Sequence, residues 1–235
     1  DADLWGSIMG RLPTYLDDDG LAMYFPLADG SRSQGSDTLT AHLLTLSHFM
    51  RQTDPRFTLP PAEQAQMQHA LIAFVTGKLQ RTFWSPQQDM TARKLSAIAA
   101  LALDGKAAPA LLDSLDIDPV RWPTHSVLDW LTVLEHVQVP GRAQRQQEAW
   151  QILRNRLAYQ GTQVGFSTDA QDHWWWLMQG PDVNAARLLL ATIGQAEWDA
   201  ERPRLVTGLL ARQKSGAWAT TTANLWAGLA LRQFS

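Results

Sequence analysis

The sequence predicts an all-α protein of the α/α-toroid class, in which helix hairpins form two concentric rings. Three observations lead to this class. Apolar residues recur at helical spacing along most of the chain, runs of β-branched residues are scarce, and weakly charged helices alternate with amphipathic ones. Helices surrounded by other helices need no charged face, so this alternation indicates an inner and an outer ring. If the ring does not close, the same pattern would produce an α-solenoid.

The helical periodicity defines the order of the elements. It predicts helices over Thr38–Thr53, Pro60–Leu79, Ser85–Asp104, Ala107–Leu115, Thr124–Val137, Ala143–Ala158, Asp182–Gly194, Asp199–Gln213 and Thr221–Phe234. Ser85-Pro86-Gln87-Gln88 has the form of a capping box, and Gly105 can end the helix that follows it. Only Thr162–Ser167 is expected to form a short strand. The helix content should therefore lie well above the usual value of about a third.

A weak repeat supports the ring architecture. Alternate helices begin with a polar residue followed by a small one, as in Thr40-Ala41, Thr91-Ala92, Asn184-Ala185 and Thr222-Ala223, with Ser126-Val127 as a looser example. Each pair precedes a stretch rich in leucine or alanine. The separations suit one helical hairpin for each repeat.

Composition excludes several classes of function. The 20 basic and 23 acidic residues leave a net charge of −3, which argues against a surface for nucleic acid or anionic membranes. The chain has no cysteine, so it cannot form disulfides, thiolate nucleophiles, iron–sulfur clusters or cysteine-type zinc sites.

The ends of the chain suggest a piece of a larger protein. It begins at Asp1 rather than at a methionine, inside a helix-like segment, so the toroid is expected to be incomplete at its N-terminus. No signal peptide opens it, and no apolar run reaches the ~18 residues that a membrane span requires. Targeting signals would then lie outside the chain.

Eleven tryptophans are a high number for this length, and three of them are consecutive at Trp174-Trp175-Trp176. Such a cluster could be a platform for a sugar or an apolar ligand, or it could fill gaps between layers of helices. Three successive side chains cannot all face one way, so at least one of them should be exposed.

Three segments resemble bacterial alpha-2-macroglobulin-like proteins. They are RLPTYLDDDGLAMYFP with GSDTLTAHLL, within Arg11–Leu44, then DVNAARLLLATI at Asp182–Ile193 and ATTTANLWAGLALRQFS at Ala219–Ser235. The resemblance covers residues 1–235 as a single domain, in the thioester-domain region of those large proteins. It implies an α/α toroid and a parent protein of many β-domains that traps proteases. The resemblance also implies that this parent lies in the bacterial periplasm, either exported or membrane-anchored.

The chemistry of that family requires a Cys-x-Glu-Gln motif, whose cysteine and glutamine condense into an internal thioester. No position here can be the cysteine. Two explanations stay open: the motif lies before Asp1, or the parent is a member without a thioester. In either case we expect this chain to be a non-enzymatic domain without a cofactor. Its partners would be neighbouring domains and, through the parent, trapped proteases.

The competing hypothesis is an α/α-toroid enzyme acting on glycans, a glycosidase or a lyase. Its candidate acids are Asp37, Asp89, Asp129 and Asp182, each near the start of an inner helix. A glycosidase needs two carboxyl groups at a defined separation, one with a raised pKa. Capping and the helix dipole favour acids at the same positions, so structural roles are the expectation.

Two further motifs have simple structural interpretations. His125 and Asp129 are four residues apart and could share a helix face as metal ligands, although an ion pair at the surface is expected. Asp17-Asp18-Asp19-Gly20 lacks the ligand spacing of a calcium loop and is expected to be a solvated turn with a positive φ at Gly20.

The sequence contains no convincing catalytic constellation. Residues 28–35 contain no GK[ST] motif for a phosphate-binding loop, and no GxSxG occurs. We therefore assign no catalytic, cofactor or metal residues. The isolated domain should instead leave an apolar surface bare for neighbouring domains, and Tyr24, Phe25 and Trp174–Trp176 are the residues expected in it.

Overall fold

The computed structural model describes residues 2–26 and 34–235, and 61% of these residues are helical. The mainly helical fold predicted from the sequence is confirmed. The chain divides into two compact units. Unit 1 comprises residues 1–117 and 132–142, and unit 2 comprises residues 118–131 and 143–235. Residues 27–33, which include most of the 28–35 segment discussed above, lie outside the described residues.

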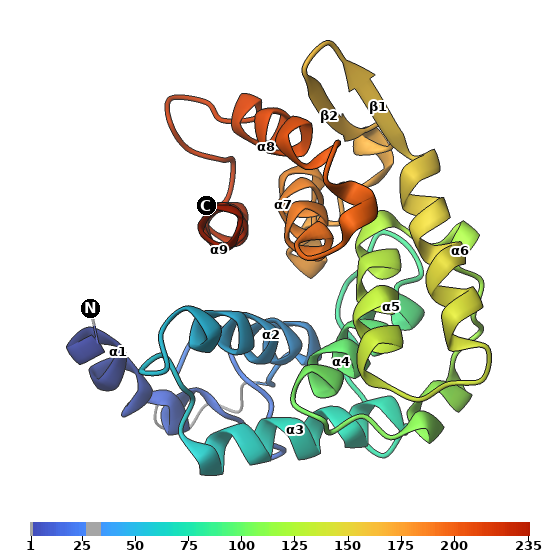
Figure 1. The fold of residues 1–235 in the computed structure, drawn as a ribbon. Coiled ribbons are helices and arrows are strands. Elements are labelled where there is room, and N and C mark those ends of the chain that lie inside the picture. Colours follow the sequence, from blue (N-terminus) through green and yellow to red (C-terminus); the bar gives the residue numbers. More distant parts are fainter. Residues whose placement is uncertain (1, 27–33) are drawn as a thin grey trace. The chain divides into compact units, whose positions relative to one another are not determined.

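The helices follow the predicted order (Figure 1). The α-helices are α1 (Ala2–Met9), α2 (Asp37–Thr53), α3 (Pro61–Val75), α4 (Met90–Leu103), α5 (Thr124–His136), α6 (Arg142–Asn155), α7 (Pro181–Thr192), α8 (Arg202–Ala211) and α9 (Thr221–Phe234). Short 3₁₀ turns are η1 (Leu12–Tyr15), η2 (Pro109–Ser114), η3 (Pro119–Arg121), η4 (Asp169–Gln171), η5 (Trp175–Leu177) and η6 (Ala196–Trp198). Among these helices, none is long and apolar enough to cross a membrane.

Several helices differ from the predictions, and α8 covers only Arg202–Ala211 of the expected Asp199–Gln213. The helix expected from Ser85 starts only at Met90, because the Ser85 hydroxyl contacts the carbonyl of Gln87 instead of capping a helix. The Pro60–Leu79 helix already ends at Val75, and Ala107–Leu115 contains only the 3₁₀ turn η2.

A further difference is a hairpin at the end of α6. Strand β1 (Leu157–Gln160) pairs antiparallel with β2 (Gln163–Phe166), with Leu157 opposite Phe166. The strand expected at Thr162–Ser167 is therefore present. Its partner β1 includes residues that were expected at the end of a helix, and α6 ends at Asn155 instead of Ala158.

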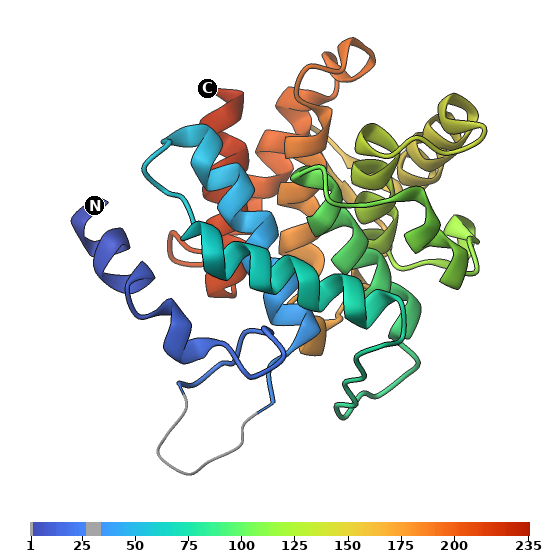
Figure 2. The same cartoon turned by 90° about the horizontal axis from the view of Figure 1, so that it is seen from below.

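In unit 1, helices α2, α3 and α4 pack against one another, and Figure 2 shows α2 and α3 crossing side by side. Their polar junction is Asp104, the C-terminal cap of α4. It accepts hydrogen bonds from His48 and Arg51 of α2, both at 3.1 Å, and from Gln64 of α3 at 3.1 Å. Burial alone would raise the pKa of Asp104, but the bonds from His48 and Arg51 lower it below its usual value. A carboxylate at a helix C-terminus opposes the helix dipole, so these donors offset an unfavourable position.

In unit 2, α7 packs against α8 and α9, and β2 packs against α8 (Figure 1). The contact between α8 and β2 depends on Gly208. A Cβ atom there would lie 2.2 Å from the carbonyl oxygen of Val164, so only glycine allows the helix to approach the strand this closely. Val164 and Phe166 are buried beneath this contact.

Two helix glycines should respond to alanine in opposite directions. Gly208→Ala should lower the free energy of unfolding by about 2 kcal/mol or more, because the strand must move away from α8. Gly228→Ala in α9 should raise it by about 0.5–1 kcal/mol, because that position is exposed, nothing lies within 4 Å of its Cβ, and alanine favours helix. Urea unfolding of both variants measures the two changes. Equal effects would show that the approach of α8 to β2 is not tight.

Candidate interaction surface and its buried clamps

The Asp17–Gly20 segment is a turn organised by one carboxylate. Oδ1 of Asp17 accepts hydrogen bonds from the backbone N–H groups of Asp19 and Leu21, both at 3.0 Å. Gly20 has a φ of 91°, as predicted. The turn is not fully solvated, however, because the Asp17 side chain is only 7% exposed. A buried carboxylate needs a cationic or hydrogen-bonding partner.

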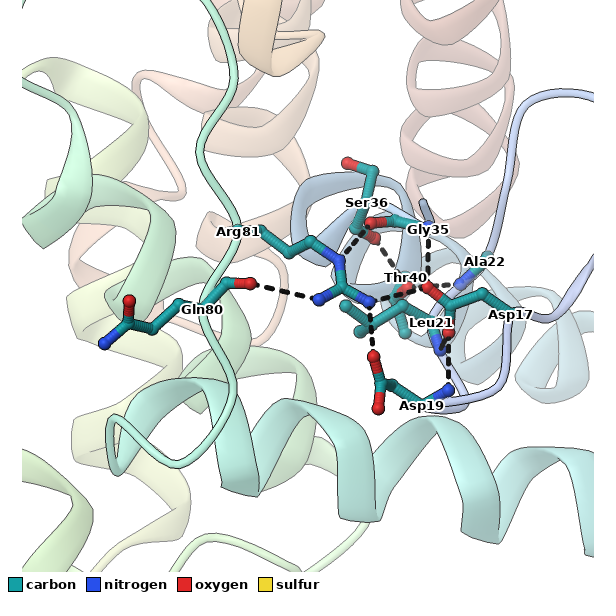
Figure 3. Close-up of polar contacts among 9 residues, drawn as sticks. All are labelled: Asp17, Asp19, Leu21, Ala22, Gly35, Ser36, Thr40, Gln80 and Arg81. Atoms are coloured by element: carbon teal, nitrogen blue, oxygen red, sulfur yellow. Dashed lines mark hydrogen bonds and ion pairs between the residues drawn. The ribbon is translucent and has the colours of Figure 1, made fainter. Parts of the chain in front are cut away.

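Arg81 is that partner (Figure 3). Its Nη2 donates to Asp17 at 2.7 Å and to Asp19 at 2.8 Å, and its Nη1 donates to the carbonyl of Gln80 at 3.0 Å. Its Nε donates to the carbonyl of Gly35 at 3.0 Å, while the N–H of Gly35 donates to Asp17 at 2.7 Å. Both backbone groups of Gly35 are thus held by one ion pair. We call Asp17, Asp19, Gly35 and Arg81 the Arg81 clamp.

The clamp fixes the charge state of Asp17. Burial by itself would raise the pKa of this carboxyl group. The hydrogen bond from Arg81 and those from the backbone N–H groups of Gly35 and Leu21 outweigh that effect and lower the pKa below its usual value. Asp17 therefore contributes its full stabilising effect at pH values above the pKa of an unfolded aspartate. That effect is lost as the pH falls from the unfolded pKa through the lower pKa of the folded state.

Thr40 closes the same segment from the other side (Figure 3). Its hydroxyl accepts from the N–H of Ala22 at 2.8 Å and donates to the carbonyl of Ser36 at 2.7 Å. The N–H of Ser36 donates to the carbonyl of Ala22 at 2.8 Å. Thr40, the polar residue of the Thr40-Ala41 pair, thus provides hydrogen-bond partners for the N–H of Ala22 and for the carbonyl of Ser36, the residue that caps α2. As a result, the two ends of the 22–36 segment are held together.

Arg93 of α4 makes a second buried clamp. It binds Asp37 of α2 through two hydrogen bonds of 2.7 and 3.0 Å, and it also donates to the carbonyl of Arg81 at 2.8 Å. The side chains of Arg93 and Asp37 are 6% and 0% exposed. Bidentate pairing of this kind fixes orientation as well as distance, so it sets how α2 and α4 meet.

Two exposed aromatic side chains neighbour the second clamp, Tyr24 through Ser36 and Asp37, and Phe83 through Arg93. Tyr24 and Phe25 are 55% and 78% exposed. Burial raises the pKa of Tyr24, its hydrogen bond with Ser36 opposes this, and the charge of Asp37 reinforces it. The guanidinium of Arg93 lies 5.8 Å from the ring centre of Phe83.

Phe83 and Trp84 are also exposed aromatic residues of unit 1, and the sequence interpretation missed them. They are 43% and 71% exposed. The available signal was an aromatic pair inside the otherwise polar stretch RTFWSPQQD, which was instead interpreted as the approach to a capping box. We call Tyr24, Phe25, Phe83 and Trp84 the aromatic surface. All four residues belong to unit 1.

The three consecutive tryptophans belong to unit 2 and have different environments. Trp174 is buried against His125, with ring centres 5.3 Å apart, and stacks on Trp176 at 5.1 Å. Trp175 is 66% exposed and meets Trp176 edge to face. The expectation that one ring would be exposed is confirmed for Trp175, while Trp174 belongs to the core.

All four candidate acids of the enzyme hypothesis are paired with arginine. Asp37 and Asp89 both contact Arg93, at 2.7 and 3.7 Å. Asp129 contacts Arg187 at 2.6 Å, and Asp182 contacts Arg212 at 2.6 Å. The structure thus pairs each of these acids with an arginine, and Asp37 and Asp89 share Arg93. In the described part of the chain, no three His, Cys, Asp or Glu side chains are grouped so as to hold a metal ion.

The expected surface pair of His125 and Asp129 is wrong. His125 is 1% exposed and Asp129 is 5% exposed, and the partner of Asp129 is Arg187 of α7. Burial lowers the pKa of His125 to about 3, and the charge of Arg187 lowers it further in the same direction. Burial raises the pKa of Asp129 in spite of the opposing charge and hydrogen bond of Arg187. The sequence spacing identified the shared helix face but could not show that another helix covers it.

The fold is that of a helical region of a bacterial alpha-2-macroglobulin. A cryo-EM reconstruction of E. coli alpha-2-macroglobulin in its native conformation matches 96% of this chain, with a TM-score of 0.65 and 16% sequence identity. E. coli alpha-2-macroglobulin activated by porcine elastase matches 97%, with the same TM-score and identity. The chain spans 13% and 19% of the lengths of those two chains. The resemblance inferred from the sequence is thus confirmed at the level of the fold. The sequence matches no protein-family model and no curated protein.

The Arg81 clamp should depend on Asp17 much more than on Asp19. Asp17→Asn should lower the free energy of unfolding by about 3 kcal/mol, because it leaves the buried Arg81 charge and the Gly35 N–H without their acceptor. Asp19→Asn should cost less than about 1 kcal/mol, because that side chain is 51% exposed. Denaturant titration of both variants at neutral pH measures the difference. Equal losses would contradict the clamp.

His125 should make the protein sensitive to acid. Its folded pKa of about 3 lies below its unfolded value near 6.5, so its contribution to stability is complete above pH 6.5 and is lost as the pH falls below it. At pH 5 the wild type should have lost about 2 kcal/mol more than His125→Phe, relative to pH 7. The raised pKa of Asp129 acts in the opposite direction in both proteins and cancels in this comparison. Parallel stability curves would rule out a buried neutral His125.

Proposed function

We propose that this chain is a non-enzymatic domain of a bacterial alpha-2-macroglobulin-like protease trap, and that its work is to make contacts with neighbouring domains. The match of nearly the whole chain to a region of E. coli alpha-2-macroglobulin carries this proposal. Within the proposal, the helix hairpins form the α/α toroid predicted from the sequence, and residues 1–235 act as one domain.

The proposed contact region is the aromatic surface, with Trp175 and Trp176 as a second area. Exposed aromatic side chains are the residues that most often anchor protein interfaces. In unit 1, Tyr24 and Phe83 neighbour the buried Arg93–Asp37 pair, and a support fixed by such a pair would keep the ordering entropy of binding small. A switch that follows protease cleavage in the parent would act on such a surface.

The chain itself would not form the covalent bond of the family, because it has no cysteine for a thioester. The parent would either carry its Cys-x-Glu-Gln motif in another segment or trap proteases by conformational change alone. We place the parent in the bacterial periplasm, exported or membrane-anchored. Its partners would be proteases, and this domain would contact neither nucleic acid nor membrane.

The alternative of a glycan-active enzyme receives less support. It requires a carboxylic acid held near a second carboxylate, whereas each of the four candidate aspartates faces an arginine. Trp175 offers an exposed ring that a sugar could stack on, which is the one observation in its favour. Hydrolysis of an oligosaccharide that is lost in Asp129→Asn or Asp182→Asn would support this alternative and contradict our proposal.

The double variant Phe25→Ser, Trp84→Ser tests the contact region in the parent protein. Both side chains are largely exposed, so the isolated chain should keep its melting temperature. In the parent, the loss of two anchoring aromatics should loosen the domain contacts. Limited proteolysis at the domain borders should then become about fivefold faster or more.

Tyr159→Ser is the matched control, since Tyr159 is an exposed aromatic on the β-hairpin of unit 2. It should leave the parent unchanged. The same preparations, mixed with a protease, test trapping: hydrolysis of a small peptide should persist while hydrolysis of a large protein is blocked. Unchanged domain borders in the double variant would contradict the contact region, and unblocked protein hydrolysis would contradict the trap.

A further inference from the structure

Unit 2 contains a buried polar cluster formed by His125, Asp129, Asn184 and Arg187. His125 and Asp129 are four residues apart on α5, and Asn184 and Arg187 are three apart on α7, so each pair shares a helix face. Arg187 joins the two faces. Its Nη2 donates to Asp129 at 2.6 Å, and its Nη1 lies 3.5 Å from the carbonyl oxygen of His125.

Trp174 packs against His125 shortly before α7 begins, with the two ring centres 5.3 Å apart. The 3₁₀ turn η5 separates Trp174 from Gly180, whose carbonyl accepts from the N–H of Asn184 at the start of α7. His125 and Asn184 are both 1% exposed. Arg187, which shares a face of α7 with Asn184, reaches both Asp129 and the carbonyl of His125, so this face of α7 is the one that meets α5.

Several polar atoms in this region have no hydrogen-bond partner within the protein. They are both ring nitrogens of His125, Oδ2 of Asp129, and both amide atoms of Asn184. Leaving one such group unpaired in the interior costs about 1–3 kcal/mol, so five of them together would exceed what a domain normally tolerates. These five atoms include both donors and acceptors, which is the pattern that water satisfies.

We propose that the cluster of His125, Asp129, Asn184 and Arg187 binds ordered internal water, which bridges α5 to α7. One buried water makes two to four hydrogen bonds, so one or two molecules can satisfy the five atoms. Asp129 Oδ2 accepts from this water, while a neutral His125 both donates to it and accepts from it. Asn184 completes the shell from α7. Bridging water and the direct bond from Arg187 to Asp129 thus both connect α5 to α7.

A crystal structure of the chain at high resolution is the direct test. We expect water density within hydrogen-bond distance of a His125 ring nitrogen and of Asn184 or Asp129 Oδ2. Asn184→Leu should displace that water, whereas Thr192→Val should not. Thr192 is a matched control because it is buried on the same helix and its hydroxyl already donates to the carbonyl of Leu189 at 2.7 Å.

A double-mutant cycle provides an independent readout. If His125 and Asn184 hold the same water, the folding constants of His125→Phe, Asn184→Leu and the double variant should deviate from multiplicative behaviour by about fivefold or more. Direct hydrogen bonds between the His125 and Asn184 side chains, with no water density between them, would overturn the proposal. If Asn184→Leu fails to fold, the wild-type density decides the question alone.

Discussion

Buried arginine–aspartate pairing is the constraint on which the rest of this structure depends. A guanidinium removed from water must keep a carboxylate and several acceptors within reach, or the unpaired charge destabilises the fold. Arg93 meets this requirement through Asp37, and Arg187 meets it through Asp129, each pair joining two helices distant in sequence. Because bidentate and buried geometries allow little adjustment, each pair determines where its two helices meet.

The same requirement explains the surface that carries the proposed function. Arg81 can be buried only because Asp17 and the carbonyl of Gly35 accept its hydrogen bonds. These bonds hold Gly35 beside the Asp17 turn, while Thr40 and the bond from Ser36 to Ala22 hold the two ends of the 22–36 segment. Tyr24 and Phe25 follow closely after Ala22, whose backbone is hydrogen-bonded to Thr40 and Ser36. Exposed aromatic rings on a rigid support fit a domain that works by contact with other domains.

Local signals in the sequence predicted the elements better than their limits. Ser36 and Thr220 cap α2 and α9 through their own side chains, so these helices start within one residue of the prediction. Ser85 has the same local pattern, yet its hydroxyl turns to Gln87 and the helix begins at Met90. A capping sequence therefore predicts the first residue of a helix only where the tertiary structure allows the following residues to be helical. Leu157 and Ala158 were likewise expected in a helix, but in the structure they pair with β2 as part of β1.

The sequence by itself determined the helical class, the order of the helices, the likeness to bacterial alpha-2-macroglobulins, and the absence of thiol chemistry. These depend on periodicity and on residue identity, both of which are local properties. Only the tertiary structure decided which arginine neutralises each aspartate, that His125 is buried, and that Phe83 lies beside Arg93. Those facts depend on side chains distant in sequence sharing one low-dielectric interior, and no local pattern records which groups will meet there.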